Sequence, residues 1–176
     1  MSTIQIYRLM LLTIILVLFS MVANAQEIPL GHQPEEEAAV LKAVDDFMET
    51  LTTQDLNRRG ELQTPDGMTY TAIHRQDGTW RVVGRPNSIF VDPQGVSTSE
   101  SVEKFWAPVV MIRGPLAMVW NPFEFWLDGK TSHCGVNLMQ LVKTEGEWKL
   151  ANTMWTHEPT ACEALRPTDL TTMRPN

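Results

Sequence analysis

The alternation of apolar and polar positions divides this chain into a helical N-terminal part and a longer part made of strands. Between residues 35 and 53, apolar side chains recur at offsets of 0, 1, 4, 7, 8 and 11 and so fall on one helical face. These positions are Val40, Leu41, Val44, Phe47, Met48 and Leu51. Glutamates at 35–37 lie where the positive end of a helix dipole favours negative charge. The pattern predicts a helix over 35–53, followed by a short second helix over 56–62.

Beyond residue 67, β-branched and aromatic residues between turn signals predict a series of strands. The expected strands are 68–75, 79–85, 105–113, 116–127, 132–142 and 148–157. Residues 65–67 (Pro-Asp-Gly) are interpreted as a turn, residues 97–103 as a polar loop, and Pro122 as the mark of an edge or a bulge. Helices followed by antiparallel strands are typical of an α+β fold. We therefore expect N-terminal helices packed in a curved, mainly antiparallel sheet.

The first 25 residues have the pattern of a secretory signal peptide. A single positive charge at Arg8 precedes an apolar run over 9–21, which ends in an Ala-Asn-Ala cleavage pattern at 23–25. The alternative is an uncleaved membrane anchor, but the apolar core is shorter than the roughly 20 residues that a spanning helix needs. After cleavage we expect a flexible leader over 26–34, one domain over 35–162 and a loose tail over 163–176. The destination would be the periplasm or the medium, without membrane contact.

The composition of the exported part narrows its expected partners. The chain carries a net charge of −7 at neutral pH, and removal of Arg8 makes it −8. An acidic surface repels phosphate backbones, so we expect no nucleic acid partner. Cys134 and Cys162 are the two cysteines; in an oxidising compartment an even count favours a disulfide, with two reduced thiols as the alternative. All six Trp follow residue 25 and fit either core packing or a pocket lined with rings.

The hairpin over 132–157 predicts which side chains face a pocket. If its turn is centred on residues 145 and 146, Asn137 lies opposite Met154. Met139 then lies opposite Asn152. These side chains would share one face that is mostly apolar with a few polar points, as in small-molecule pockets. The ligand-binding candidates are Asn137, Asn152, Met139, Met154, Trp120 and Tyr70.

Two residues on these strands could carry acid–base chemistry. His133 shares the face of Asn137, and an imidazole titrates near neutral pH; the alternative is a strand-end histidine with no task. Glu124 lies between two phenylalanines, where apolar surroundings would raise the pKa of a carboxyl, unless the side chain simply faces water. The sequence contains no glycine-rich phosphate loop and no paired metal-ligand motif. We therefore expect no metal and no cofactor.

The last strands resemble a known family. Similarity to exported members of the nuclear transport factor 2-like superfamily is carried by the segments VWNPFEFWLDGKTSHCGVNLMQLVKTEGEWKLANTMWT (119–156) and HEPTACEAL (157–165). The resemblance covers most of residues 35–162 and implies a cone-shaped α+β fold with a pocket between the helices and the concave face of the sheet. Ketosteroid isomerase, scytalone dehydratase and SnoaL-like, polyketide-cyclase-like proteins share this fold. Similar sequences often carry an acidic residue where this chain has Asn137, and an amide cannot take a proton, which argues against isomerase chemistry.

The implied fold hosts enzymes as well as plain binding proteins, so it does not decide the function. The first hypothesis is a domain that binds a small apolar or aromatic molecule in its pocket. The second is an isomerase, dehydratase or cyclase in which His133 or Glu124 moves the proton. The third is an interaction protein with a vestigial pocket that dimerises through the outer face of its sheet. We expect the mature protein to be a homodimer.

Overall fold

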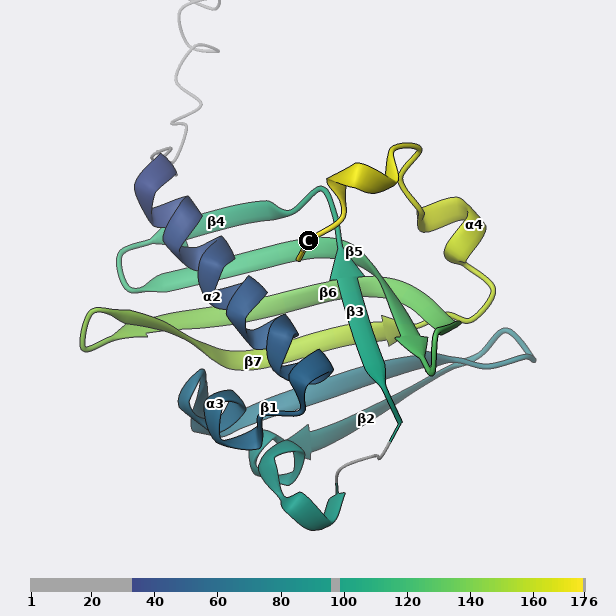
Figure 1. Ribbon diagram of the computed structural model, residues 1–176, viewed down its shortest axis with the longest axis horizontal. Coiled ribbons are helices and arrows are strands. Elements are labelled where there is room, and N and C mark those ends of the chain that lie inside the picture. Colours follow the sequence, from purple (N-terminus) through teal and green to yellow (C-terminus); the bar gives the residue numbers. More distant parts are fainter. Residues whose placement is uncertain (1–32, 96–98, 176) are drawn as a thin grey trace, which may run out of the picture. The chain divides into compact units, whose positions relative to one another are not determined.

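The computed structural model describes residues 33–95 and 99–175, so the expected signal peptide lies outside the described residues. Helix α2 (Pro34–Thr53) lies across the sheet, and α3 (Leu56–Glu61) follows it (Figure 1). Both helices confirm the sequence prediction. Three acidic residues occupy the first turn of α2, and the Asp55 side chain caps α3 by accepting a hydrogen bond from the Arg58 backbone N–H at 2.9 Å. Within these residues, no helix has the length and apolar character needed to cross a membrane.

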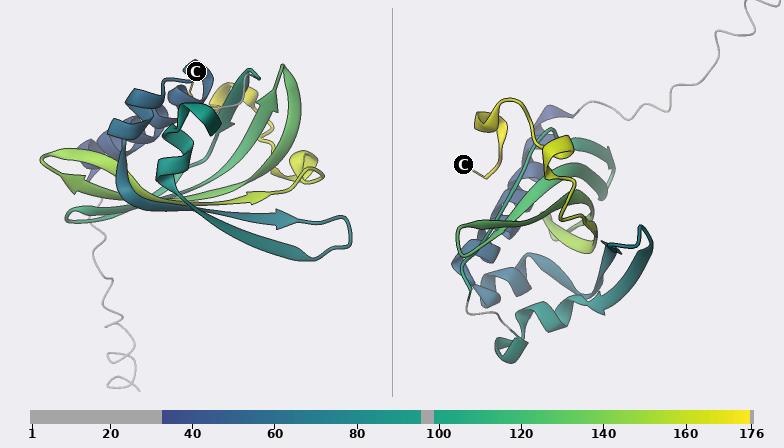
Figure 2. Two further views of the ribbon diagram at one scale, coloured as in Figure 1. Left: turned by 90° about the horizontal axis from the view of Figure 1, so that it is seen from below. Right: turned by 90° about the vertical axis from the view of Figure 1, so that its right-hand side faces the viewer.

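Seven strands of the described part of the chain form one sheet. They are β1 (Gln63–His74), β2 (Trp80–Pro86), β3 (Ser101–Phe105), β4 (Val109–Arg113), β5 (Leu116–Leu127), β6 (Lys130–Thr144) and β7 (Glu147–His157). The order across the sheet is β2-β1-β7-β6-β5-β3, and β4 also pairs with β5. Every paired neighbour is antiparallel except β1 and β7, which run parallel. The sheet curves around the helices without closing (Figure 2), which confirms the expected α+β architecture.

The hydrophobic core lies between α2 and the concave face of the sheet. Buried apolar side chains of the helix meet those of the central strands; among them are Val40, Val44, Met48, Phe105, Val119, Phe123, Met139, Leu141 and Leu150. Each large apolar side chain that is removed from water stabilises the fold by about 1.5–3 kcal/mol. The periodic apolar face predicted for the first helix is therefore the face that holds it against the sheet.

The ladder beside β5 is split into two strands opposite a proline. The sequence suggested one strand over 105–113 after a polar loop, but β3 already begins at Ser101, and β4 begins only at Val109. The interruption between them lies opposite Pro122, whose carbonyl accepts a hydrogen bond from the Trp106 N–H at 3.2 Å. In an antiparallel strand, the backbone nitrogen and the carbonyl oxygen of one residue point to the same side. The Pro122 nitrogen, which has no hydrogen to donate, therefore faces the interruption between β3 and β4. The break explains how a proline occupies an interior strand.

The β6–β7 hairpin departs from the expected register a few pairs from its turn. The turn is centred on residues 145 and 146, whose φ angles are +55° and +86°, as the sequence predicts. The pairs nearest the turn also agree, but Ala151 is an extra residue that shifts the ladder by one position. Asn137 therefore lies opposite Trp155 rather than Met154. The expected register is wrong from this bulge outward.

The extra residue of β7 lies against a second irregularity in β1. Between Gln63 and Met68 the pairing of β1 with β7 loses its regular step, in the segment that the sequence suggested was a turn. A Cβ atom on Gly67 would lie 1.9 Å from the Ala151 carbonyl oxygen, so this approach requires glycine. The two irregularities meet at one place and let β1 continue where a turn was expected.

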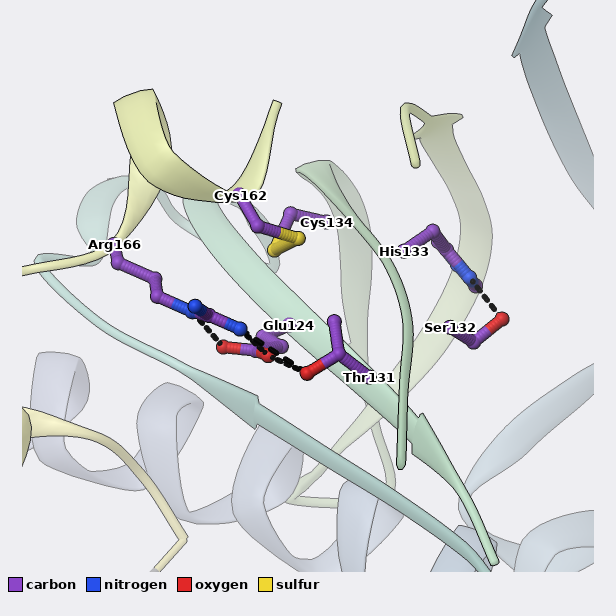
Figure 3. Close-up of a disulfide and its surroundings, with 7 residues drawn as sticks. All are labelled: Glu124, Thr131, Ser132, His133, Cys134, Cys162 and Arg166. Atoms are coloured by element: carbon purple, nitrogen blue, oxygen red, sulfur yellow. Dashed lines mark hydrogen bonds and ion pairs between the residues drawn. A yellow bond between two sulfur atoms is a disulfide. The ribbon is translucent and has the colours of Figure 1, made fainter. Parts of the chain in front are cut away.

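The segment after Cys162, which the sequence suggests is a loose tail, contacts the domain at several points. Cys162 begins α4 (Cys162–Leu165) and forms a disulfide with Cys134 of β6 (Figure 3). A short 3-10 turn, η3 (Leu170–Thr172), leads to Arg174. The backbone of Arg174 pairs with that of Phe105 at 2.7 Å, and its guanidinium pairs with the Asp45 carboxylate of α2. These contacts make the segment part of the folded domain.

Replacing both cysteines, by Cys134→Ala with Cys162→Ala, should lower the free energy of unfolding by about 3–4 kcal/mol, because the bridge restricts the unfolded chain over a loop of this length. The two residues are 28 positions apart in the sequence. Urea denaturation under oxidising conditions measures the loss. As a control, a reducing agent should weaken the wild type by a similar amount and leave the double variant unchanged. Two thiols that react with an alkylating agent in denatured, unreduced protein would disprove the bridge.

Candidate functional site

A cavity of about 230 Å³ lies between α2 and the concave face of the sheet. α3 and the 3-10 turn η1 (Asn87–Val91), which η2 (Pro93–Gly95) follows, complete its wall. The apolar lining consists of Phe47, Met48, Leu51, Phe90, Phe125, Met139 and Trp155. The polar lining consists of Arg59, Gln63, Thr69, Glu103, His133, Asn137 and Thr153. Apolar walls with a few convergent polar groups are typical of small-molecule pockets.

The strand register decides which polar groups reach the cavity. Side chains alternate between the two faces along a strand, and the pairing places Glu103, Phe125 and His133 in one row across β3, β5 and β6. The next row on this face contains Phe105, Phe123 and Gly135, and the row beyond it contains Asn137 and Trp155. Segments far apart in the sequence thus bring a carboxyl, an imidazole and an amide to the same wall.

Glu103 is the central titratable group of this wall. The Asn137 side-chain amide donates a hydrogen bond to Glu103 Oε1 at 2.8 Å. Burial raises the pKa of the Glu103 carboxyl to about 7, against the smaller lowering effect of that hydrogen bond. At neutral pH the carboxyl is therefore divided between its protonated and ionised forms, and it can either donate or accept a proton.

His133 lies within a stack of rings. Its side chain is buried, its ring centroid is 4.2 Å from that of His157 and 5.4 Å from that of Trp155, and its Nδ1 lies 3.1 Å from Ser132 Oγ. Burial, together with the neighbouring His157, lowers the pKa of His133 to about 4. The imidazole is therefore neutral at pH 7 and contributes a ring to the wall.

Glu124, the other catalytic candidate from the sequence, lies away from the cavity. Its carboxylate is buried beneath α4, where Arg166 Nε donates a hydrogen bond to Glu124 Oε2 at 2.7 Å and Thr131 Oγ1 donates one to Oε1 at 2.5 Å (Figure 3). Burial alone would raise the pKa of Glu124, but the hydrogen bonds and charge of Arg166, with Thr131, lower it overall. This ionised, paired carboxylate joins the C-terminal segment to the sheet.

The ligand-binding candidates divide between the two faces of the sheet. Asn137 and Met139 line the cavity. Four others lie on the outer face: Asn152, Met154, Trp120 and Tyr70. For Asn152 and Met154 the cause is the bulge at Ala151, which turns both residues outward. The Asn152 amide is occupied there, since its Oδ1 accepts from the Met68 N–H at 2.9 Å and its Nδ2 donates to Gln140 Oε1 at 3.0 Å.

Most residues that line the cavity are not among the candidates from the sequence, and three of them, Thr153, Trp155 and Glu103, show why. Thr153 and Trp155 face the cavity in place of Asn152 and Met154, which the bulge turns outward. Glu103 lies in a segment interpreted as a polar loop, and its strand becomes visible only through pairing with β5. Residues 101–105 (Ser-Val-Glu-Lys-Phe) do not alternate between polar and apolar, so periodicity gives no local signal for this strand.

Two buried polar atoms near the cavity have no hydrogen-bond partner among the described residues. They are Asn121 Oδ1, on the strand position paired with Asn137, and His157 Nδ1. His157 also lines a second cavity of about 220 Å³, which shares Trp155 with the first. Unpaired polar atoms are uncommon inside proteins, so the region around Trp155 offers hydrogen-bonding capacity that the described residues do not use.

Glu124, Cys134 and Cys162 bring their potential ligand atoms within 4.8 Å of one another. The two sulfurs are joined in the disulfide, and the carboxylate is paired with Arg166. Because a metal binds thiolates and free carboxylates, this cluster does not provide a metal site.

The comparison with known proteins identifies the fold. No protein-family model and no curated protein matches the sequence. A protein of unknown function from Nostoc punctiforme with a cystatin-like fold is 12% identical, with a TM-score of 0.57, over 73% of this chain and 95% of that chain. A nuclear transport factor 2-like protein of unknown function from Pseudomonas putida is 16% identical, with a TM-score of 0.56, over 81% and 94% of the two chains.

A third similar structure is the beta subunit of a putative aromatic-ring-hydroxylating dioxygenase from Novosphingobium aromaticivorans. It is 13% identical, with a TM-score of 0.55, over 72% of this chain and 92% of that chain. Identities this low carry information about architecture and none about activity. The described domain therefore has the nuclear transport factor 2-like fold, which is also called the cystatin-like fold.

Proposed function

We propose that this domain binds a small, mainly apolar molecule containing a ring, and that Glu103 and Asn137 recognise one polar group of that molecule. The proposal rests on one observation, a carboxyl in an apolar cavity wall whose described hydrogen-bond partner is Asn137. The Glu103 side chain is partly buried, and a ligand hydroxyl or amide can use the carboxyl lone pairs that Asn137 leaves without a partner. An apolar cavity of about 150 Å³ holds a benzene ring. The larger volume here suits one or two fused rings.

A second candidate function is proton transfer, as in an isomerase, dehydratase or cyclase. It is favoured by the raised pKa of Glu103, since a general acid or base works best when its pKa lies near the working pH. His133 is a weaker base than an ordinary histidine, and Glu124 lies outside the cavity. If the domain is an enzyme, Glu103 accepts the proton and Asn137 positions its carboxyl.

We also propose that the domain forms a homodimer through the outer face of its sheet. Strand pairing aligns Val109, Trp120, Leu138, Met154 and Tyr70 in one row across five strands. All but Leu138 are exposed. A continuous exposed apolar surface is typical of an interaction site, and a second copy related by two-fold symmetry would present the same row.

The proposed place of action is the periplasm or the medium. The Cys134–Cys162 bridge is compatible with an oxidising compartment. The first 25 residues carry the pattern of a signal peptide, and they lie outside the described residues.

Filling the cavity should abolish ligand binding. Thr153→Trp places an indole in the cavity, whereas Met154→Trp places one on the outer face of the same strand and serves as the matched control. Native mass spectrometry of protein purified from the exported fraction should show a small-molecule adduct on the wild type and on Met154→Trp, lost on denaturation, and none on Thr153→Trp. A wild type that carries no adduct would favour the interaction protein with a vestigial pocket.

Glu103 should titrate near pH 7, as measured by carbon-13 NMR of its side-chain carboxyl. Asn137→Leu should raise this pKa further, because it removes the hydrogen bond that stabilises the ionised carboxylate.

The raised pKa of Glu103 also predicts how the stability of the fold depends on pH. Protonation of Glu103 stabilises the fold below about pH 4.5, and this stability is lost as the pH rises through 7. Relative to Glu103→Gln, the wild type should lose about 3 kcal/mol of unfolding free energy over that range. Glu49→Gln, at an exposed position, should not change the profile. Titration of Glu103 below pH 5 would contradict the assignment.

Placing a charge on the outer face should dissociate the homodimer. Trp120→Glu buries a carboxylate in the proposed interface, whereas Leu170→Glu alters an exposed apolar residue of η3, away from the strands. Light scattering at micromolar concentration should give a dimer mass for the wild type and for Leu170→Glu, and a monomer mass for Trp120→Glu. A monomeric wild type would refute the interface.

A further inference from the structure

Arg59 is a buried cation in the wall of the cavity. Its side chain is 8% exposed and extends from α3. Its Nε donates to Thr50 Oγ1 at 3.1 Å, and its two terminal nitrogens donate to the carbonyls of Thr50 and Phe90 at 2.6 and 3.3 Å. A guanidinium has about five N–H donors. Within the described residues, some of these donors have no partner, and no carboxylate pairs with the charge.

The observed hydrogen bonds account for part of this arrangement. Thr50 lies in the last turn of α2, where free carbonyls carry partial negative charge. Arg59 therefore ties together α2, α3 and η1, and a purely structural role would end there. That role does not explain why a charge without a counter-ion lines an apolar cavity. Buried charges are normally paired, because removing them from water is costly, and burial lowers the pKa of Arg59 accordingly.

The cavity does not supply the missing negative charge. Glu103 is the carboxyl of this wall, but its hydrogen bond goes to Asn137, and burial keeps it partly protonated at neutral pH. Among the described residues, no hydrogen bond or ion pair joins Arg59 to Glu103, since Arg59 donates to Thr50 and Phe90 and Glu103 accepts from Asn137. The net charge of the chain is −7, so the protein as a whole does not attract anions. An anion would be drawn into the cavity only by the nearby charge of Arg59.

We propose that the ligand is a ring-containing carboxylate whose anionic group pairs with Arg59 while its other end reaches Glu103 and Asn137. The ring would lie among Phe47, Leu51 and Phe90, which line the cavity together with Arg59. A planar guanidinium with unused donors matches the two oxygens of a carboxylate. This inference rests on the proposed binding function and specifies its ligand class.

Isothermal titration calorimetry with 6-hydroxy-2-naphthoate and 6-hydroxy-2-naphthamide, below called naphthoate and naphthamide, tests this proposal. The two compounds share shape, ring and a far hydroxyl group for Glu103 and Asn137, and they differ in charge. At pH 6, below the pKa of Glu103, the cavity carboxyl is mainly neutral and does not repel the anion. We expect the wild type to bind naphthoate at least about tenfold more tightly than naphthamide. One charge-assisted hydrogen bond changes the dissociation constant by a factor of about this size.

Arg59→Gln should reduce this ratio to near one, with the affinity for naphthamide little changed. Arg58→Gln is the matched control: it removes the same charge from the adjacent position of α3, where Arg58 faces Glu61 and Asp46 rather than the cavity. Because Arg59 also ties three elements together, thermal unfolding first establishes that each variant is folded. Arg59→Lys, which keeps the charge but loses the planar fork, should show an intermediate ratio and serves where Arg59→Gln does not fold.

The outcomes separate the two proposals. If naphthamide binds and naphthoate binds no more tightly, the cavity is a binding site and the carboxylate inference is wrong. The same holds if Arg59→Gln keeps the full preference for naphthoate. If neither compound binds the wild type, both proposals fail.

Discussion

The concave face of this domain depends on one backbone constraint, the close approach of β1 and β7 at Gly67 and Ala151. Side chains alternate along a strand, so one extra residue exchanges the two faces for everything beyond it. The bulge at Ala151 turns Thr153 and Trp155 toward α2 and turns their neighbours outward. Gly67 makes this possible, because any other side chain would collide with the Ala151 carbonyl. The cavity wall on β7 is thus a consequence of a glycine on another strand.

α2 supplies both a packed core and an open cavity from one periodic face. Its first turns bury Val40 and Val44 against the sheet, where Leu141 and Leu150 fill the space. Toward its C-terminus, the same face presents Phe47, Met48 and Leu51 to the cavity. Met48 and Met139 belong to the core cluster and also line the cavity. The cavity is therefore an opening at one end of a continuous core, and the packing of that core offsets the cost of leaving it open.

Local signals in the sequence were sufficient for the elements and insufficient for the site. The helix over 35–53, the turn at 145–146 and the pairing of the two cysteines follow from periodicity, turn chemistry and an even cysteine count. Glu103 could not be found in this way, since a polar segment becomes a strand only through pairing with β5. The outward placement of Asn152 and Met154 depends on a bulge that has no signature of its own in the sequence.

Glu124 shows the same division between local and distant causes. Alternation along β5 correctly separates it from its aromatic neighbours, which by itself would place it in water. It is buried because α4 and Arg166 fold back over it, and that contact is fixed by a disulfide between residues distant in the sequence. A sequence pattern describes which face a side chain takes. What covers that face is decided by segments elsewhere in the chain.

The charges in the cavity also bear on the choice between binding and catalysis. Removal of a proton by Glu103 leaves negative charge on the reacting molecule, and an enzyme must stabilise that charge with hydrogen-bond donors or a cation. Arg59 is the cation of this cavity wall. If a ligand carboxylate pairs with it, its charge is neutralised before any proton moves, and the neutral groups His133 and Asn137 remain. Those groups can orient a ligand, but they stabilise a developing anion less than a free guanidinium does. A carboxylate ligand would therefore favour binding over proton transfer, whereas a neutral ligand would leave Arg59 available for catalysis.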